Sequence, residues 1–269
     1  TIRSELPLSE DQMRTVAPSI FALGKHASRS ERYRYITTID VLRGLRKEGF
    51  EPFMVAQGAS RVEGKAEFTK HMIRMRHAGQ VQTKPEAQEI ILINSHDGAS
   101  SYQMLAGMFR FVCCNGLVVG DVVQDLRIPH KGNVQGEVIE GAFRVLEEFR
   151  TVEAHAESMK AVTLEHPEQP AFATAALALR FREVEEGGAA KPPPVTAEQL
   201  IQARRMEDVD HSLWTTFQRV QENVIRGGLP GRSAQGRRQQ TRPVQSIDRG
   251  VSLNRALWTL AEEMRKLKA

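Results

Sequence analysis

Apolar and polar residues follow two kinds of pattern along the first 130 residues of the chain. The stretch 38–49 carries an apolar stripe at helical spacing, and Gly49 is a typical helix stop. Residues 68–77 alternate apolar and basic side chains, whereas residues 89–95 form a continuous apolar run. Both patterns predict strands, and a further strand through residues 52–57 is expected to precede them.

The segment that begins at Ser100 is predicted to be a helix. Ser100 and Gln103 have the spacing of a capping box, and four apolar side chains recur at helical spacing up to Val112. Asn115 and the glycine after it would then end this helix. Residues 117–128 are rich in β-branched side chains and return to a strand pattern.

After Pro129 the patterns are helical only. Residues 136–159 and 171–186 both predict helices, and Thr196 opens a third helix that runs to Arg226. A last helix covers residues 253–268. The third and last helices, Val195–Arg226 and Leu253–Lys268, are expected to pack through their apolar stripes and to bury Phe217, Val220, Leu257 and Leu260.

The predicted fold class is α+β, with an N-terminal core of mixed strands and helices followed by a mostly helical C-terminal half. Four segments are expected: an α+β core over 1–130, a helical extension over 131–187, a linker over 188–195, and C-terminal helices over 196–269. The linker is indicated by its glycines, alanines and three consecutive prolines. The last segment carries an Arg-rich loop at residues 226–250.

Composition places the chain among ordinary globular proteins, with 41% hydrophobic residues. No apolar run approaches the roughly 18 residues of a membrane span, and the first residues lack the apolar core of a secretory signal. The two cysteines, Cys113 and Cys114, are adjacent, which suits a reducing compartment and favours two buried thiols over a redox pair. We therefore expect a cytoplasmic protein with no membrane partner.

Catalytic motifs are absent from the sequence. It contains no G-x-S-x-G elbow, no Walker A loop, no H-E-x-x-H and no paired C-x-x-C, so enzymatic activity is the minority hypothesis and no cofactor or metal is expected. The pair His96 and Asp97 could contribute to a metal site, with His71, His77, Asp121 or Asp125 as candidates to complete it. Turn chemistry explains the same stretch, "NSHDGAS", more simply.

Positive charge is concentrated in the segment 226–249. It carries six arginines and one acid, a local charge of +5, whereas the whole chain carries only +4. Guanidinium groups stay charged and can bind two phosphate oxygens at once, so this segment predicts a polyanion partner, although a solvated loop would have a similar composition. The predicted phosphate contacts are Arg237, Arg238 and Arg242, with Arg232, Arg249, Arg74 and Arg76 as weaker candidates.

Arg74 and Arg76 enter this set through the strand pattern. If Ile73 and Met75 face the core, the two arginines are expected to face outward together. Charges on an exposed edge strand also prevent pairing between sheets, and that alternative explains them equally well.

Three stretches together resemble the DUF932 family of phage- and plasmid-carried proteins of unknown function. They are "YITTIDVLRGLRKEGFEPF", "DGASSYQMLAGMFRFVCCNGLVVGD", and "LWTTFQRVQENVIRGG" with its continuation "RRQQTRPVQSIDRGVSLNRALWTLAEEM". The resemblance covers most of the chain and is most specific over 98–120 and 213–264. It implies no catalytic residues, but mobile elements commonly carry DNA-handling and anti-defence proteins.

Two functions therefore remain open. The first is a nucleic-acid-binding protein, in its sharpest form a Rad52-like protein that anneals single-stranded DNA, as the expected order strand, strand, strand, helix over residues 52–113 suggests. Proteins of that kind assemble into rings, which would make the chain a homo-oligomer. The second is an interaction protein without enzymatic activity, such as an inhibitor directed at a host defence nuclease.

Overall fold

The computed structural model describes residues 1–24, 37–60, 64–78, 86–97, 100–111, 115–119, 126–128, 133–181 and 192–268. The chain divides into two compact units, Thr1–Arg150 and Thr151–Ala269. Each unit has its own core. Cys113, Cys114, Asp121 and Asp125 lie outside the described residues, so the predictions made for them stay predictions.

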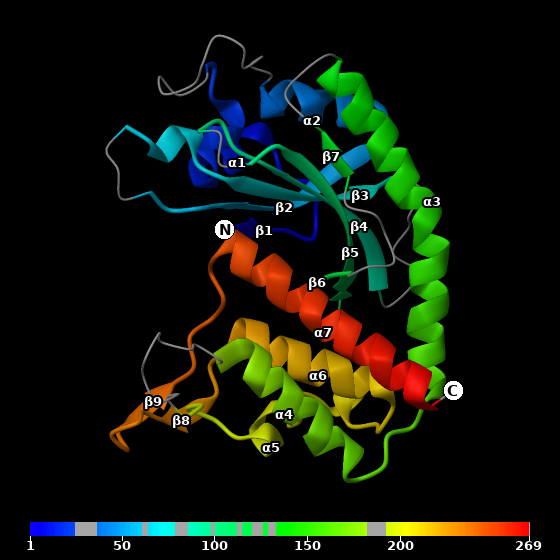
Figure 1. Ribbon diagram of the computed structural model, residues 1–269. Coiled ribbons are helices and arrows are strands. Elements are labelled where there is room, and N and C mark those ends of the chain that lie inside the picture. Colours follow the sequence, from blue (N-terminus) through cyan, green and yellow to red (C-terminus); the bar gives the residue numbers. More distant parts are fainter. Residues whose placement is uncertain are drawn as a thin grey trace. The chain divides into compact units, whose positions relative to one another are not determined.

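The first unit contains a curled antiparallel sheet (Figure 1). Its strands are β1 (Ile2–Arg3), β2 (Phe50–Gln57), β3 (His71–His77), β4 (Glu86–Asn94), β5 (Tyr102–Arg110), β6 (Asn115–Val118) and β7 (Leu126–Ile128). They pair in the order β1-β2-β3-β4-β5-β6, and β7 also pairs with β5. The strands predicted over 52–57, 68–77 and 89–95 correspond to β2, β3 and β4, which form the middle of this sheet.

The predicted core of mixed strands and helices is wrong, because the segment expected to be a helix after Ser100 is the strand β5. Both faces of β5 are buried: Tyr102, Met104 and Met108 lie on one face, and Leu105 and Phe109 on the other. A strand that is apolar on both faces has no period-two pattern, and its apolar residues can then match a helical spacing by chance. The chain is α+β through a continuous antiparallel sheet in its N-terminal half and helices in its C-terminal part.

Short helices lie between β1 and β2 and between β2 and β3 in the chain. They are α1 (Glu10–Val16), the 3-10 helix η1 (Pro18–Phe21), α2 (Thr38–Lys47) and the 3-10 helix η2 (Ala66–Phe68). The cap of α2 is Thr37, whose side chain accepts from the backbone N–H of Asp40. Gly49, just after α2, has a φ of 87°, which favours glycine at the turn into β2.

The described residues of the second unit are mainly helical and include one small hairpin. The long helix α3 (Val134–Ala161) enters it, followed by α4 (Glu168–Phe181), α5 (Ala197–Leu200), the 3-10 helix η4 (Met206–Asp208), α6 (Leu213–Arg226) and α7 (Ile247–Lys268). The strands β8 (Pro230–Arg232) and β9 (Arg238–Gln240) form the hairpin. Within the described ranges, no helix combines the length and apolar content that crossing a membrane requires.

The single helix expected from Thr196 to Arg226 is wrong, because the chain leaves the helical conformation after one turn. Thr196 does open a helix, α5, and forms a capping box with Gln199. Backbone hydrogen bonds then tie Leu164 to His211 and Leu213 to Val162, and this pairing requires an extended chain just before α6. Tertiary hydrogen bonds therefore override the local helical pattern there.

Helix α6 is buried on all sides from Leu213 to Val224. Its apolar side packs Trp214 and Phe217 against Trp258 of α7, with ring centroids 6.4 and 6.0 Å from that tryptophan. Several of its polar side chains are paired, as when Gln221 donates to Asn254 at 2.7 Å. The predicted burial of Phe217, Val220 and Leu257 is confirmed, whereas Leu260 is only partly buried.

We predict that Leu257→Ala lowers the free energy of unfolding by about 2 to 5 kcal/mol, because Leu257 has no exposed surface and its truncation leaves a cavity. The matched control is Leu267→Ala on the same helix, since Leu267 is 82% exposed. Urea unfolding measures both. Equal losses for the two variants would contradict the packing of α7 described above.

Candidate nucleic-acid interface

The arginine-rich segment is fastened to the end of helix α6. Gly227, with a φ of 65°, ends the helix, and a Cβ there would lie 2.7 Å from the Thr241 carbonyl oxygen. The Gly228 N–H donates to Thr241, and the Thr241 N–H donates back to Leu229. The Val244 N–H donates to the Ile225 carbonyl at 2.8 Å. The two ends of the segment are therefore held side by side by the backbone.

Between these ends the chain forms the β8–β9 hairpin rather than a loop. Its turn closes through hydrogen bonds from Ser233 N–H to the Arg237 carbonyl and from Gly236 N–H to the Ser233 carbonyl, each 2.9 Å. The Ser233 hydroxyl accepts from the Gln235 and Arg237 N–H groups. Gly236 has a φ of 77°, which a residue with a side chain rarely adopts.

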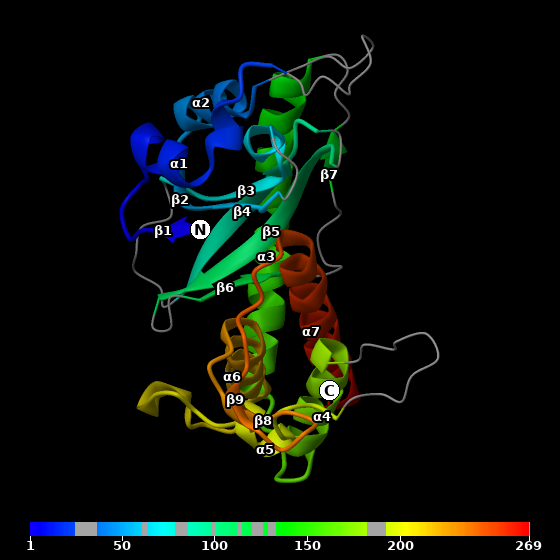
Figure 2. The same cartoon turned by 90° about the vertical axis from the view of Figure 1, so that its left-hand side faces the viewer.

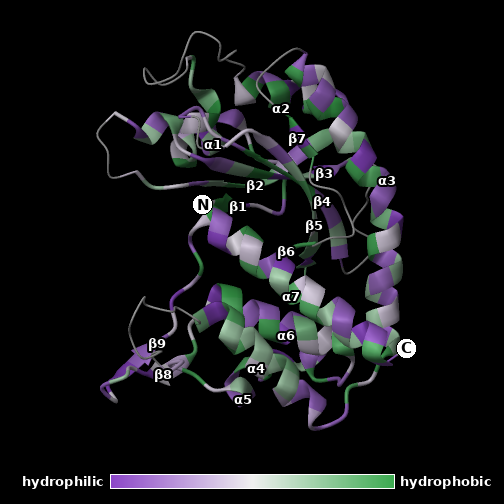
Figure 3. Cartoon of the chain, in the orientation of Figure 1, coloured by the Kyte–Doolittle hydropathy of each residue, from purple (hydrophilic) through white to green (hydrophobic). Residues whose placement is uncertain are grey.

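The arginines of this segment are exposed to solvent, and the structure separates them by their contacts. Arg249 lies in the first turn of α7 and donates to the carbonyls of Leu179 and Arg180, so it ties two helices together. The Arg232 side chain donates to the Gly236 carbonyl at 3.1 Å. In the part of the chain that the structure describes, no hydrogen bond or ion pair engages the guanidinium groups of Arg237, Arg238 and Arg242. Figure 3 shows β9 as hydrophilic, in keeping with its sequence.

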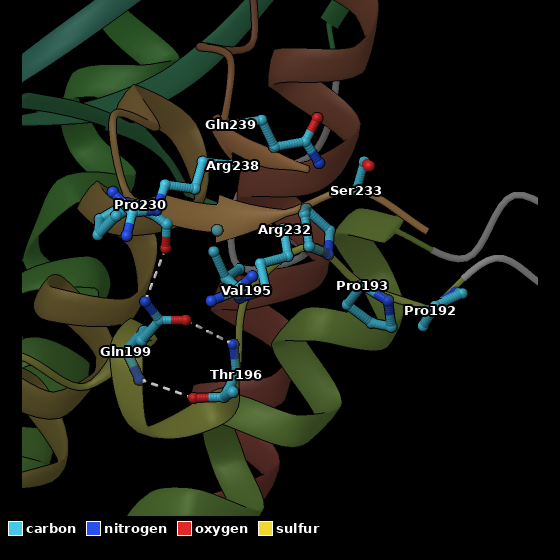
Figure 4. A pocket seen from close by; sticks show the side chains of 12 residues that line it. Pro192, Pro193, Val195, Thr196, Gln199, Pro230, Arg232, Ser233, Arg238 and Gln239 are labelled. Carbon is cyan, nitrogen blue, oxygen red and sulfur yellow. Dashed lines mark hydrogen bonds between the residues drawn. The ribbon is translucent and has the colours of Figure 1, made fainter. Parts of the chain in front are cut away.

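A groove of about 600 Å³ lies beside the hairpin (Figure 4). One side is formed by Pro192–Val195, which precede α5, and the other by β8 and β9. Figures 1 and 2 both place α5, β8 and β9 next to one another. Arg232 and Arg238, which are paired across the hairpin, both line the groove.

The two sides of the groove are joined by direct contacts. The Arg232 N–H donates to the Pro194 carbonyl at 2.9 Å. Gln199 closes the capping box with Thr196 and also donates to the Pro230 carbonyl at 2.8 Å (Figure 4). A Cβ on Gly231 would lie 2.2 Å from the Pro194 carbonyl oxygen, so only glycine permits this approach.

The expectation that Arg74 and Arg76 face solvent is wrong. Their exposed fractions are 4% and 5%, because the face of the sheet that carries them is buried as well. Both guanidinium groups pair with the carboxylate of Glu89 on β4, the Arg76 contact being 3.0 Å. An alternating pattern identifies the two faces of a strand but does not show whether the polar face is exposed to solvent. These two arginines are therefore removed from the candidate phosphate contacts.

The surroundings of these arginines explain how two buried cations share one carboxylate. Arg74 also donates to the Leu117 carbonyl at 2.8 Å, and a Cβ on Gly116 would lie 2.6 Å from its guanidinium carbon. Arg76 lies over the rings of Phe53 and Phe109, 4.3 and 4.2 Å from their centroids. Carbonyl oxygens and aromatic faces thus replace the water that the guanidinium groups have lost.

His71 and His96, two of the residues considered as metal ligands, do lie close together. Their ring centroids are 5.4 Å apart, but both Nε2 atoms contact the Thr38 hydroxyl, at 2.9 and 3.2 Å. The described residues include no group of three or more His, Cys, Asp or Glu that could hold a metal ion. The structure thus places the two imidazoles in a buried hydrogen-bond network.

The donors and acceptors in this network can be assigned, because each hydroxyl and each neutral imidazole has a single proton to donate. The carboxamide oxygen of Gln57 accepts from both the N–H and the hydroxyl of Ser19, so the Ser19 oxygen is free to accept from Nδ1–H of His71. Nε2 of a neutral His71 must then accept the Thr38 proton, and His96 must donate its Nε2–H to Thr38. Burial, and secondarily the nearby His96, lower the pKa of His71 to about 3, which keeps this ring neutral.

The groove and the buried network were not anticipated from the sequence. The run Pro192–Pro194 was interpreted as a linker, although three prolines in a row have few conformations to lose on folding and suit a rigid wall. The residues of the network, Ser19, Thr38, Gln57, His71 and His96, are spread over 78 positions of the chain. No local pattern connects them.

Comparison with known proteins gives a family without an assigned function. The model of the domain of unknown function DUF932 matches residues 25–258. The Escherichia coli K12 proteins described as UPF0380 protein YafZ and UPF0380 protein YfjQ are each 50% identical over 263 residues, covering 98% of this chain and 93% of each relative. No solved structure shows a significant match to this chain.

We predict that Glu89→Gln destabilises the protein by about 3 to 5 kcal/mol, because it leaves two buried guanidinium groups without a counter-charge. Glu263→Gln is the control, since Glu263 pairs with Lys266 at an exposed position and its loss should cost less than about 1 kcal/mol. The measurement is urea unfolding at neutral pH. A similar decrease in the free energy of unfolding for both variants would show that the Glu89 carboxylate stabilises the fold no more than a surface ion pair does.

The pKa of His71 predicts a pH dependence of stability. The folded pKa is about 3 and the ordinary value is 6.5, so the unfolded chain binds a proton that the folded chain does not. His71 therefore does not lower the free energy of unfolding above pH 6.5, where the ring is neutral in both states. As the pH falls from 6.5 toward 3, the free energy of unfolding decreases by up to about 1.4 kcal/mol per pH unit. In ¹⁵N spectra of histidine-labelled protein at pH 5, His71 should be the neutral Nδ1–H tautomer. A protonated ring at that pH would contradict the network.

Proposed function

We propose that this chain, which belongs to the DUF932 family, binds single-stranded nucleic acid through the arginines of the β8–β9 hairpin. The observation that carries the proposal is the exposure of Arg237, Arg238 and Arg242 without a protein partner among the described residues. Among the described residues, buried or half-buried arginines such as Arg46, Arg74 and Arg76 are engaged with carboxylates, carbonyls or rings. These three guanidinium groups remain available to an anion.

Phosphate is the anion that best matches this surface. A guanidinium group donates in a planar fork that fits two oxygens of one phosphate, and a row of such groups follows a repeating backbone. The segment 226–249 has a local charge of +5, with only Asp248 opposing it. Because the hairpin offers no aromatic side chain, the interaction would have little preference for base sequence.

The role of each arginine in this proposal differs. Arg237, Arg238 and Arg242 would bind phosphates, and Arg232 would support them from the opposite strand. Arg249 is exposed, but its hydrogen bonds to Leu179 and Arg180 give it a structural role first. Arg74 and Arg76 are excluded by their burial.

Strand annealing is the sharper form of this function. The order of three strands and a helix that it requires over residues 52–113 is not observed, because the fourth element is the strand β5. The proposal therefore concerns binding. Whether the bound strand is annealed to its complement is a separate question that a fluorescence-quenching assay with complementary oligonucleotides answers.

We predict that the triple variant Arg237→Ala, Arg238→Ala, Arg242→Ala binds a labelled single-stranded oligonucleotide more weakly and with less dependence on salt. Each lost phosphate contact should reduce the slope of log affinity against log salt by about 0.7, so the slope should flatten by about 2. The matched control removes three positive charges elsewhere, at the exposed Lys47, Arg144 and Lys266. Fluorescence anisotropy at several salt concentrations measures both variants.

The control separates a local site from the effect of net charge. If both triple variants lose affinity equally, the hairpin is not the site. If neither changes the affinity or the slope, the hairpin is a solvated surface, and the alternative of a protein-directed interaction protein takes precedence.

A further inference from the structure

We infer that the groove beside the β8–β9 hairpin is a subsite for one unpaired nucleotide of the bound strand, with its base against the prolines and its phosphate on Arg232 and Arg238. This inference rests on the proposed function and adds to it a reason for single-strand selectivity. It follows from the composition of the groove, its size and its rigidity.

The composition of the groove combines an apolar wall with positive charge. Pro192, Pro193 and Pro230 contribute rigid apolar rings, while Arg232, Arg238 and Gln239 contribute hydrogen-bond donors. Among the described residues, the groove lining contains no acidic side chain. A ligand that fills it should therefore carry a negative charge and a flat, weakly polar portion, and a nucleotide has both.

The size of the groove is suitable for such a ligand. Its volume of about 600 Å³ lies within the range of pockets that hold organic ligands, roughly 300 to 1,000 Å³. A base inside a duplex is stacked and paired, so its flat faces cannot reach the prolines. Only a base that is splayed away from its neighbours can enter, as in the recognition of single strands elsewhere.

The two walls of the groove are held together by hydrogen bonds within the protein. Gln199 links α5 to the Pro230 carbonyl, and the Arg232 N–H holds β8 against Pro194. The proline rings lose little conformational freedom when a ligand packs against them, which favours binding. Arg238, across the hairpin from Arg232, has no protein contact among the described residues that a phosphate would have to displace.

The experiment changes the apolar wall and leaves every charge in place. We expect the double variant Pro193→Ser, Pro230→Ser to bind a labelled oligothymidylate about fivefold or more weakly, because it loses the packing of one base. The slope of its log affinity against log salt should equal that of the wild-type protein. The wild-type protein is expected to bind a duplex of equal length more weakly than the single strand, and the variant should bind that duplex as the wild-type protein does. The matched control is Pro243→Ser, since Pro243 is exposed in the same segment but does not line the groove.

A second measurement avoids any effect of the variants on folding. Wild-type protein is photocrosslinked to an oligonucleotide that carries 4-thiothymidine, and the modified peptides are identified by mass spectrometry. Adducts within 192–199 or 230–239 are the expected result. Adducts confined to other parts of the chain would overturn the subsite.

The outcomes distinguish this inference from the proposed function. Wild-type protein that binds neither oligonucleotide at low salt overturns both. Wild-type protein that binds single strand and duplex equally, with the double proline variant unchanged, overturns the subsite and leaves phosphate binding by the hairpin intact. Displacement of the oligonucleotide by polyglutamate at equal charge concentration would also overturn it, because a peptide carboxylate would then satisfy the groove equally well.

Discussion

The cost of removing a guanidinium group from water decides which arginines of this chain can act on a partner. Arg74 and Arg76 have lost their water, and the fold compensates with the Glu89 carboxylate, carbonyl oxygens and phenylalanine rings. Arg237, Arg238 and Arg242 keep their water and have no such compensation among the described residues. The same side chain is therefore structural at Arg74 and Arg76 and remains available to a partner at Arg237, Arg238 and Arg242.

The availability of these arginines depends on the backbone that presents them. Gly227 and Gly231 allow two close approaches, at the end of α6 and against Pro194, that any side chain would block. The capping glutamine Gln199 adds a link from α5 to β8. A positively charged segment held in this way loses less conformational entropy on binding than a flexible loop of the same composition.

The sequence predicted those parts of the fold in which a local pattern agrees with the tertiary environment. The strands β3 and β4 and the helices α3 and α7 have such patterns, as does the capping box at Thr196. The prediction failed at β5, where burial on both faces erased the alternation, and before α6, where the backbone of Leu164 and His211 pairs across the chain.

The candidate site shows the same limits. The density of positive charge predicted the hairpin arginines as candidate phosphate contacts. Strand alternation predicted that Arg74 and Arg76 face solvent, because an alternating pattern takes no account of what covers a face of the sheet. The groove depends on a contact between Pro194 and Gly231, 37 positions apart, and nothing in either short stretch predicts the other. Long-range proximity of this kind comes only from the three-dimensional structure.

The central claim is that exposed arginines of this chain bind the phosphates of a single strand. The most direct test is the affinity of the wild-type protein for a labelled mixed-sequence single strand, measured from about 50 to 300 mM salt. We predict that log affinity falls linearly with log salt with a slope of about −3, which corresponds to about four phosphate contacts. An affinity that does not depend on salt, or no binding at the lowest salt concentration, would contradict the claim.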